Sequence, residues 1–295
     1  MSSVRGTPPG AAPHPAPDAG DRRSRILGAG VEGRRGVAVA LVSTAVVVTI
    51  LAVLVLNSPG WPEVRRSFFN VDVFRESFPE IARRFLLNVQ AFLLAEVFIL
   101  VFALFIAVLR SLSGPVFFPI RALAVAYTDL FRGIPTVLVI YILGFGAPAL
   151  QLQGVPDSPF FWGVVALVLV YSAYVAEVYR AGIESVHPSQ VASARSLGLS
   201  RWKALRFVVL PQAVRRVIPP LLNDFIGLQK DSALLALIGV LEAFRRSQVD
   251  TAGAFNFTPY VATALLFVAI TIPLARVTDW LVARERGRYQ AEGTL

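Results

Sequence analysis

The sequence predicts an all-α integral membrane protein with six transmembrane helices. Of its 295 residues, 55% are hydrophobic, and the mean hydropathy of +0.63 is too high for a soluble domain that must cover its core with a polar surface. Long apolar stretches recur along the chain and are separated by loops. Basic residues gather in alternate loops, which is the charge pattern of cytoplasmic loops in membrane proteins.

The first 35 residues predict a disordered cytoplasmic arm. They are rich in Pro, Ala, Gly and Arg and hold almost no large apolar side chain, so they cannot bury enough surface to offset the entropy lost on ordering. Residues 37–56 follow without a charge and make about 30 Å of helix, enough to cross the hydrocarbon. This run is longer than the core of a cleaved signal peptide, so we expect residues 36–57 to remain as an anchor.

Five further apolar stretches predict the remaining spans, and residues 58–84 are expected to lie outside the cell between the first two spans. The five stretches are residues 85–109, 122–147, 160–180, 214–241 and 257–281. With the N-terminus inside, the inner loops hold 18 Lys or Arg and the outer loops hold 7. This bias places both termini in the cytoplasm, including a tail at residues 284–295, and the protein in the cell (plasma) membrane.

The composition excludes several kinds of site. No Cys is present, which removes disulfides, thiolate metal sites and Cys nucleophiles. The two His, His14 and His187, lie outside the apolar stretches, so a His-based metal site is not expected. No G-x-x-x-x-G-K-[ST] motif occurs. The chain is therefore expected to have no catalytic residue, to bind no cofactor and to leave ATP to another protein.

The loop before the fifth apolar stretch carries most of the positive charge. Within residues 180–216, seven Lys or Arg face a single acid, which accounts for +6 of the net charge of +9. Pro188 predicts a helix start, Gly198 suits a left-handed turn at the end of that helix, and Ser200 suits the N-cap of a second helix. We therefore expect two short helices lying flat under the membrane.

The second short helix is expected to end before Leu210 and Pro211 and to carry an apolar side. The residues of that side are Trp202, Leu205, Val208 and Val209. Such a helix pair could be a solvated basic loop, a nucleic-acid-binding helix-turn-helix or a docking surface for another protein. Both ends of the loop run into membrane spans, so no independent domain can enter a groove, and no nucleic-acid partner is expected. The geometry favours docking.

The same loop resembles the EAA loop of ABC importer permeases, a Glu-Ala-Ala followed by three residues, Gly, nine residues, Ile, one residue and Leu-Pro. The matching positions are Ala192, Ser193, Ala194, Gly198, Val208, Leu210 and Pro211. Neighbouring blocks look like the polar amino acid subfamily, and the resemblance covers roughly residues 80–283. These blocks read FRGIP (131–135), YSAYVAEVYRAGIESV (171–186), LPQA (210–213) and PPLLNDFIGLQKDSALLALIGVLE (219–242).

This resemblance implies a five-helix permease core at residues 85–283, to which the anchor adds one N-terminal helix. It implies coupling helices at residues 187–211 that sit in a cleft of a separate ATP-binding subunit, with Trp202 as an anchor and Arg201 among the surrounding cations. It also implies a second permease subunit, an extracytoplasmic substrate-binding protein, an amino acid substrate and a bacterial membrane.

Two positions depart from the family motif. Ala192 stands where the motif has Glu, and Ser193 stands where it has the first Ala. Any ion pair between that Glu and the ATP-binding subunit is therefore absent. Coupling in this chain is expected to depend on shape, on Gly198 and on the surrounding Arg residues.

Charged residues inside the apolar stretches need either a partner or a water-filled cavity. They are Glu96, Asp129, Arg132, Glu177, Asp224, Lys230 and Asp231. Helical spacing allows local ion pairs of Asp129 with Arg132 and of Glu177 with Arg180. Alternatively, some of these groups line the path of a zwitterionic amino acid, whose charges need partners once desolvated. The candidates for that path are Asp129, Arg132, Tyr174, Glu177, Asn223 and Lys230.

One helix face in the fifth apolar stretch holds Asn223, Gly227 and Lys230. Gly227 either leaves room for a substrate path or marks close packing against another helix. Both interpretations are compatible with the spacing.

Three classes of function fit these features. The leading hypothesis is the transmembrane permease subunit of an ATP-driven ABC importer of a polar amino acid, which works by alternating access. The alternative is an ion-coupled secondary amino acid transporter, although no internal repeat of the kind common in such folds is evident. The third is a membrane-anchored interaction or regulatory protein whose basic loop binds anionic lipid or nucleic acid.

Overall fold

The computed structural model describes residues 34–112, 114–151 and 153–292, with side chains from residue 36 to residue 284. The described residues form helices and loops without a strand, as predicted. The chain divides into two compact units, Met1–Glu63 and Val64–Leu295. The predicted disordered arm, apart from its last two residues, lies outside the described part of the chain.

The first unit contains helix α2 (Arg34–Leu56), which confirms the helix predicted at residues 37–56. Its apolar side chains are exposed within the unit, as expected of a helix that meets lipid. Its hydroxyl groups are satisfied inside the helix, because Ser43 Oγ and Thr44 Oγ1 both donate to Ala40 O, at 3.0 and 2.8 Å. Both hydroxyl donors are therefore satisfied within the helix, as a lipid environment requires.

Helix α4 (Val71–Ser111) is longer than the span predicted at residues 85–109. Asn70 caps it by accepting hydrogen bonds from the backbone N–H groups of Asp72 and Val73, which moves the helix start well before the apolar stretch. The short helix α3 (Trp61–Phe68) precedes it. The segment expected between the first two spans is therefore largely helical.

The continuous helix predicted at residues 122–147 is wrong, because the chain bends by 103° after Gly133. Helix α5 (Phe118–Gly133) ends at Ile134, whose extended backbone is the conformation favoured before a proline, here Pro135. The chain continues as α6 (Thr136–Tyr141), the π-turn η1 (Ile142–Gly146) and α7 (Ala147–Ala149).

The rest of the second unit consists of helices joined by short connections. In order they are α8 (Pro159–Glu184), α9 (Pro188–Ser196), α10 (Arg201–Ala204), the π-turn η2 (Leu205–Val209), α11 (Leu210–Asp231), the 3-10 helix η3 (Ser232–Ile238), α12 (Ala243–Ala254) and α13 (Thr258–Glu292). Helix α13 passes residue 281 and runs into the predicted tail, so most of residues 284–295 are helical.

Among the described residues, four helices are long and apolar enough to cross a membrane, or five if the bent pair of α5 with α6 and α7 counts as one span. The count of six is therefore not confirmed. The missing span is α11, which has the length but carries several charges. These are Arg215, Arg216, Asp224, Lys230 and Asp231.

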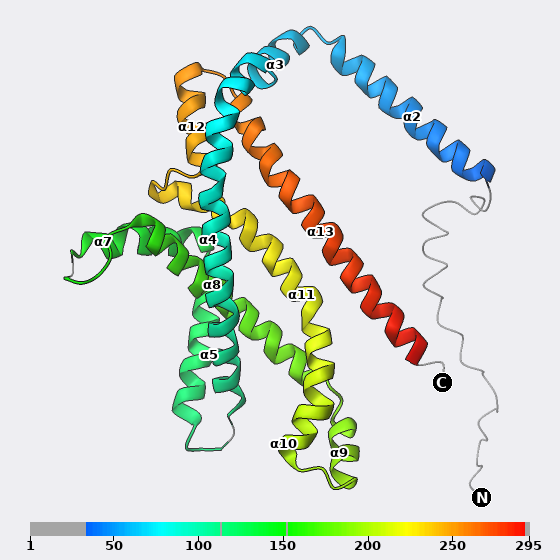
Figure 1. Cartoon of the computed structure of the whole chain (residues 1–295), viewed down its shortest axis with the longest axis vertical. Coiled ribbons are helices and arrows are strands. Elements are labelled where there is room, and N and C mark those ends of the chain that lie inside the picture. Colours follow the sequence, from blue (N-terminus) through cyan, green and yellow to red (C-terminus); the bar gives the residue numbers. More distant parts are fainter. Residues whose placement is uncertain (1–33, 113, 152, 293–295) are drawn as a thin grey trace, which may run out of the picture. The chain divides into compact units, whose positions relative to one another are not determined.

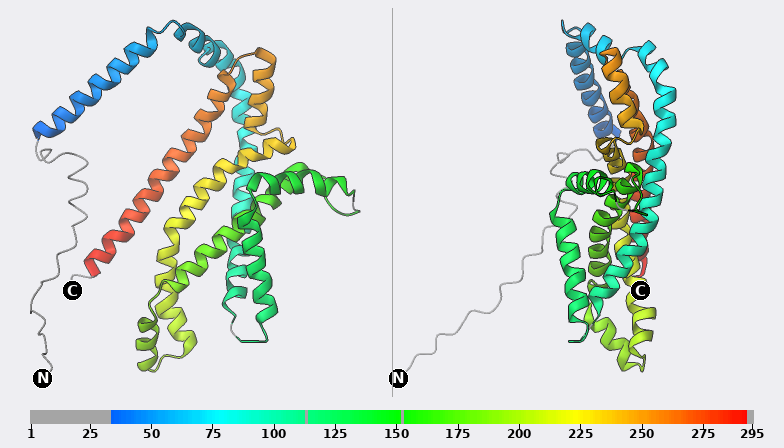
Figure 2. Two further views of the ribbon diagram at one scale, coloured as in Figure 1. Left: turned by 180° about the vertical axis from the view of Figure 1, so that it is seen from behind. Right: turned by 90° about the vertical axis from the view of Figure 1, so that its left-hand side faces the viewer.

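Helix α8 lies at the centre of the second unit and packs against α4, α5 and α11 (Figure 1). The core between these helices contains fully buried side chains such as Ile99, Leu167 and Leu228. A second cluster joins Phe85 of α4 to Ala262 of α13. Within this unit, α12 and the pair α9–α10 lie at opposite ends (Figures 1 and 2).

Candidate functional site

The predicted coupling loop folds as two short helices joined by a turn, as the sequence predicts. His187 caps α9, and Pro188 occupies its first turn. Gly198 adopts φ +85°, which confirms the left-handed turn, and Leu199 N donates to Ala194 O at 3.2 Å to close the helix end. Ser200 Oγ accepts from Lys203 N at 3.3 Å, which confirms the second N-cap.

The second helix does not end before Leu210 and Pro211, and that prediction is wrong. The π-turn η2 joins α10 directly to α11, with Leu210 N donating to Leu205 O, five residues back. Pro211 lies in the first turn of α11, where its missing N–H is tolerated. The second coupling helix is thus continuous with a long helix of the core.

The nine residues predicted to dock a partner lie on or beside this helix pair. Ala192, Ser193, Gly198, Arg201, Trp202, Leu210 and Pro211 are exposed, Val208 is half-buried and Ala194 is buried. The predicted apolar side is not a single side. Trp202 is 66% exposed, whereas Val209 is 7% exposed and faces the interior. Trp202 is therefore accessible on the outer side of the loop, whereas Val209 packs the loop against the core.

The coupling loop is held against both neighbouring core helices. Val209 packs in one buried cluster with Val186 and Ala213, and Arg216 donates to Ser185 O across the two helices. Close approach of α8 to α11 requires Gly182, because a Cβ there would lie 2.1 Å from Val217 Cγ1. A force on α9 or α10 therefore acts on α8 and α11 together.

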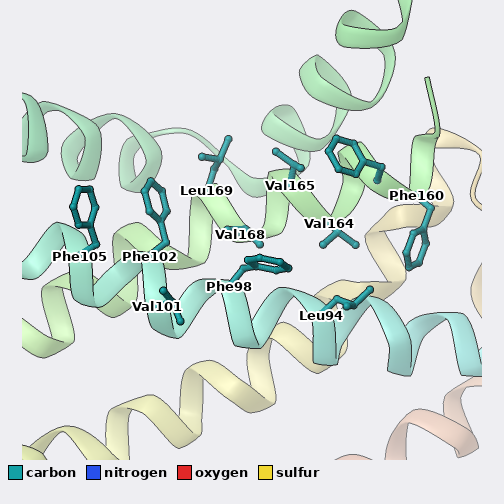
Figure 3. Close-up of a pocket in the computed structure, with 11 residues that line it drawn as sticks. Leu94, Phe98, Val101, Phe102, Phe105, Phe160, Val164, Val165, Val168 and Leu169 are labelled. Atoms are coloured by element: carbon teal, nitrogen blue, oxygen red, sulfur yellow. The ribbon is translucent and has the colours of Figure 1, made fainter. Parts of the chain in front are cut away.

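An apolar pocket of about 670 Å³ lies between α4 and α8 (Figure 3). Every lining side chain is a Leu, Val or Phe, among them Phe98, Phe102 and Val168. A zwitterion would find no hydrogen-bond partner among these side chains. The pocket suits hydrocarbon, and we exclude it as an amino acid site.

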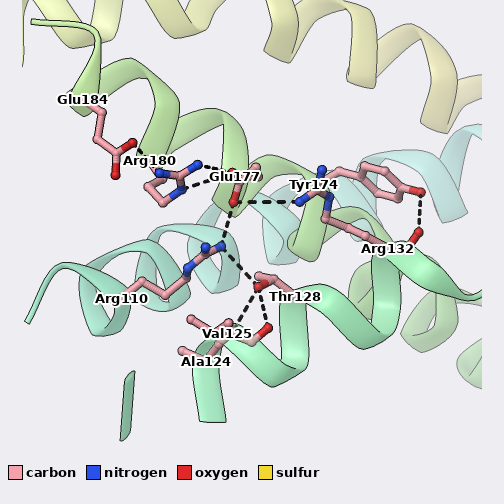
Figure 4. A network of polar contacts seen from close by, with 9 residues as sticks. All are labelled: Arg110, Ala124, Val125, Thr128, Arg132, Tyr174, Glu177, Arg180 and Glu184. Atoms are coloured by element: carbon pink, nitrogen blue, oxygen red, sulfur yellow. Dashed lines mark hydrogen bonds and ion pairs between the residues drawn. The ribbon is translucent and has the colours of Figure 1, made fainter. Parts of the chain in front are cut away.

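A polar network joins α4, α5 and α8 around Glu177 (Figure 4). Arg110 Nη1 lies 2.7 Å from Glu177 Oε2 and donates to Thr128 Oγ1 at 3.2 Å. Arg180 contacts both Glu177 and Glu184 on its own helix. The side chains of Arg110 and Glu177 are only 13% and 22% exposed. The network therefore ties three helices near the end of α8 that leads into the coupling loop.

Arg132 is the most loosely held cation of this network. Its Nη1 lies 3.9 Å from Glu177 Oε2, and its side chain is 41% exposed. Its guanidinium carbon lies 5.9 Å from the ring centre of Tyr174, whose Oη donates to Arg132 O at 3.4 Å. Arg132, Tyr174 and Glu177 are thus brought together, as the substrate-path hypothesis requires.

The local ion pairs predicted from spacing are half right. Glu177 pairs with Arg180, but Asp129 is exposed and forms no ion pair with Arg132 or with any other described residue. Sequence reasoning also missed Arg110 and Thr128 as members of the network. Thr128 precedes Arg132 by one helical turn, so the spacing indicates that they share a helix face. The contact of Thr128 with Arg110 on α4 joins two helices, and no sequence spacing predicts it.

The remaining path candidates lie elsewhere on α11. Gly227 packs closely against α8, because a Cβ there would lie 3.2 Å from Tyr171 Oη, which favours the packing interpretation. Tyr171 Oη donates to Asp231 Oδ2 at 2.9 Å. Asn223 and Lys230 are exposed and make no hydrogen bond or ion pair with the described residues of the network around Glu177. The six candidates therefore do not form one site.

Two acids of the apolar stretches lie on helices that contact each other, α4 and α11. Glu96 of α4 lies within electrostatic range of Asp224 on α11 and of Tyr179 on α8. Asp224 Oδ2 is buried without a hydrogen-bond partner among the described residues. No group of three or more His, Asp or Glu suited to a metal ion occurs in the described part of the chain.

A second buried network, missed by sequence reasoning, ties α4 to α12. Asn88 Nδ2 donates to Glu242 Oε2 at 2.7 Å, and Asn88 Oδ1 accepts from Ala243 N at 3.2 Å. Glu242 also caps α12 by accepting from the N–H groups of Phe244 and Arg245. Burial raises the pKa of Glu242, and these hydrogen bonds oppose that rise.

These features define a class of protein before any comparison: a helical membrane protein whose second unit has an exposed pair of short helices at one end. The profile of the family described as "binding-protein-dependent transport system inner membrane component" matches residues 99–287. The chain belongs to this family, which confirms the resemblance and the permease fold.

Individual relatives agree with this assignment. The chain is 34% identical over 223 residues to "Probable glutamine ABC transporter permease protein GlnM" of Bacillus subtilis, covering 75% of this chain and all of GlnM. It is 36% identical over 159 residues to "Arginine transport system permease protein ArtQ" of the same organism, covering 54% of this chain and 72% of ArtQ.

Solved structures show the same fold. A chain of an amino acid ABC transporter with histidines superposes with a TM-score of 0.64 at 30% identity and covers 70% of this chain and 94% of its own length. A chain of the MetNI methionine ABC transporter superposes with a TM-score of 0.55 at 17% identity, covering 70% of this chain and 95% of its own length, and is similar in fold alone.

Proposed function

We propose that this chain is the permease subunit of an ATP-driven importer of a polar amino acid in a bacterial cell membrane. It works with a separate ATP-binding subunit, a second permease subunit and an extracytoplasmic substrate-binding protein. The permease fold, the family membership and the relatives that carry glutamine and arginine in their names support this proposal. The ion-coupled alternative finds no support among the relatives.

One observation carries the proposal: the helix pair α9–α10 is rigidly attached to α8 and α11 but presents an exposed outer surface. The π-turn makes α10 continuous with α11, and Val209 packs against Val186, two residues beyond the end of α8. Closure of an ATP-binding subunit around this pair would move both core helices as a unit. That is the movement alternating access requires of a permease.

The substrate path is proposed to pass the exposed side of the network around Glu177. Arg132 is loosely paired and can exchange Glu177 for the carboxylate of an amino acid, while Tyr174 offers a ring face and a hydroxyl beside it. Asp129, exposed and unpaired on the same helix, is the candidate for the ammonium group. Asn223 and Lys230 remain predictions for another part of the path.

Reconstituted vesicles test the proposed function. The chain is purified with the ATP-binding subunit that copurifies with it and inserted into lipid vesicles together with the substrate-binding protein. We expect uptake of a polar amino acid only when ATP is present on the side of the vesicle membrane that carries the ATP-binding subunit. Uptake driven by an ion gradient without the ATP-binding subunit would contradict the proposal in favour of a secondary transporter.

A further inference from the structure

The outer surface of the coupling loop carries a set of cations without counter-charges. We call Arg195, Arg201, Lys203 and Arg206 the basic surface. All four are exposed, and none forms an ion pair with a described residue. The sequence holds no Asp or Glu between Glu184 and Asp224, and Glu184 is itself paired with Arg180. These charges remain available to a partner.

A groove of about 510 Å³ opens beside these cations, between the end of α8 and the coupling helices. Val191, Leu205 and Val209 give it an apolar lining, and Arg195 and Arg201 also line it. A side chain entering this groove would bury apolar surface while an adjacent carboxylate meets two guanidinium groups. The groove thus fits an apolar residue next to an acidic residue.

Ala192 keeps Arg195 free for such a contact. The two residues lie three positions apart on α9, where oppositely charged side chains pair on a helix surface. A Glu at position 192 would draw Arg195 into a pair within the loop and lower the charge of the basic surface. The departure from the family motif therefore increases the positive charge that the loop presents.

We propose that the basic surface selects an ATP-binding subunit whose docking cleft is acidic, with a carboxylate against Arg195 and Arg201 and an apolar side chain in the groove. This inference rests on the proposed function, since it names the chemistry of the partner at the coupling loop. A protein rather than a lipid surface is the occupant because the groove gives a single apolar side chain a place directly beside two guanidinium groups. Trp202 is 66% exposed and Leu197 is 84% exposed. Exposed Trp and Arg together are typical of the anchors of protein interfaces.

Binding measurements test this charge assignment. The permease is placed in nanodiscs of zwitterionic lipid, and the affinity of its copurifying ATP-binding subunit is measured at rising salt. We expect Ala192→Glu and the double variant Arg195→Gln, Arg201→Gln each to weaken binding by at least about tenfold at low salt, with a smaller loss at high salt. Ala192→Gln, matched in size to Glu but uncharged, should weaken binding less than Ala192→Glu. Arg215→Gln, which removes a cation of α11 outside the groove, should bind like the wild type.

Unchanged or tighter binding of Ala192→Glu would overturn the proposal, because it would mean that the cleft carries a cation opposite position 192. Failure of the wild type to bind any ATP-binding subunit would instead contradict the proposed function. The two failures are therefore distinguishable.

Zero-length cross-linking identifies the groups in contact. Lys203 and Lys230 are the only lysines of the chain, so a carbodiimide that joins amines to carboxylates has few places to react. In the Arg195→Lys variant, we expect a cross-link from Lys203 or position 195 to an Asp or Glu of the ATP-binding subunit in the assembled complex. A cross-link to the carboxyl group of phosphatidylserine, with none to the protein, would overturn the proposal in favour of a lipid-facing surface.

Discussion

At the scale of single residues, Gly198 holds the turn between the coupling helices in a left-handed conformation. At φ +85° a side chain is strained by its own backbone, although a Cβ at this position would meet no heavy atom within 4 Å. The strain of a non-glycine residue in this region is about 1 to 2 kcal/mol. A substitution therefore changes the direction of the turn without crowding the core.

From this geometry we predict that Gly198→Val abolishes uptake while the protein remains in the membrane at the wild-type level. The β-branched side chain strains the turn and displaces α9 relative to α10. Uptake in vesicles and the amount of membrane-inserted protein are the measurements. Gly253→Val is the control, because Gly253 has an ordinary φ and equally open surroundings. Wild-type uptake by Gly198→Val would contradict the docking role of the loop.

Glu177 is the acid on which the network between α4, α5 and α8 depends. Glu177→Gln removes the negative charge that lies 2.7 Å from Arg110 Nη1. The Arg110 side chain is only 13% exposed, so water cannot replace this partner. We predict a loss of about 1.5 to 3 kcal/mol in the free energy of unfolding, measured by SDS titration in mixed micelles. Glu184→Gln is the control. Glu184 is 61% exposed and pairs with Arg180, so its replacement should cost less than about 1 kcal/mol. Equal losses in the two variants would contradict the assigned role.

At the scale of secondary-structure elements, α4 and α12 are joined by hydrogen bonds between Asn88 and Glu242, which are 2% and 1% exposed. Each partner satisfies the other, and Glu242 also caps α12. Removing one partner therefore leaves the other buried with one hydrogen bond fewer.

A double-mutant cycle measures this connection. We predict that Asn88→Ala and Glu242→Ala each destabilise the protein, and that the double variant loses about 1 to 3 kcal/mol less than the sum of the two. The readout is again the free energy of unfolding. Because this contact joins α4 to α12, and α12 lies at the end of the second unit opposite to α9 and α10, binding of the ATP-binding subunit should be unchanged. Simple additivity of the two losses would contradict a direct interaction.

The elements with local signals were the ones that the sequence predicted well. Helix α2, the cap at Ser200 and the turn at Gly198 depend on neighbouring residues, so their residue types are visible in the chain. The bend after Gly133 also has a local cause in Pro135, but an apolar stretch long enough to span the membrane concealed it. Element boundaries were less predictable, because α4 and α13 continue as helix beyond their apolar stretches.

Contacts between distant segments could not be read from the chain. Arg110 and Glu177 are 67 positions apart, and Asn88 and Glu242 are 154 apart, so no spacing rule connects them. The same limit explains the error at Asp129, where helical spacing indicated a local pair but Arg132 turns towards another helix. The candidate path was therefore only partly brought together, around Arg132, Tyr174 and Glu177.

At the scale of the whole molecule, the extra N-terminal helix is separate from the conserved permease fold. The family match at residues 99–287 lies entirely in the second compact unit, and the full length of GlnM corresponds to 75% of this chain. The role expected of α2 is one of topology, because a single crossing by α2 would place the N-terminus on the side opposite to the residues that follow it.

The absence of Cys allows this topology to be tested with single cysteines on a silent background. The positive-inside bias predicts that the coupling loop and the N-terminus share the cytoplasm, while the connection before α8 lies outside. In intact cells, a membrane-impermeant maleimide should label Asp157→Cys, but should label Ser189→Cys and Ser3→Cys only after permeabilisation. Ser189 and Asp157 are both exposed, so a difference between them reports the side of the membrane and not burial. Labelling of Ser3→Cys in intact cells, with Ser189→Cys protected, would mean that α2 does not cross. Labelling of Ser189→Cys in intact cells would show that the whole topology is inverted, with the coupling loop outside the compartment that contains ATP.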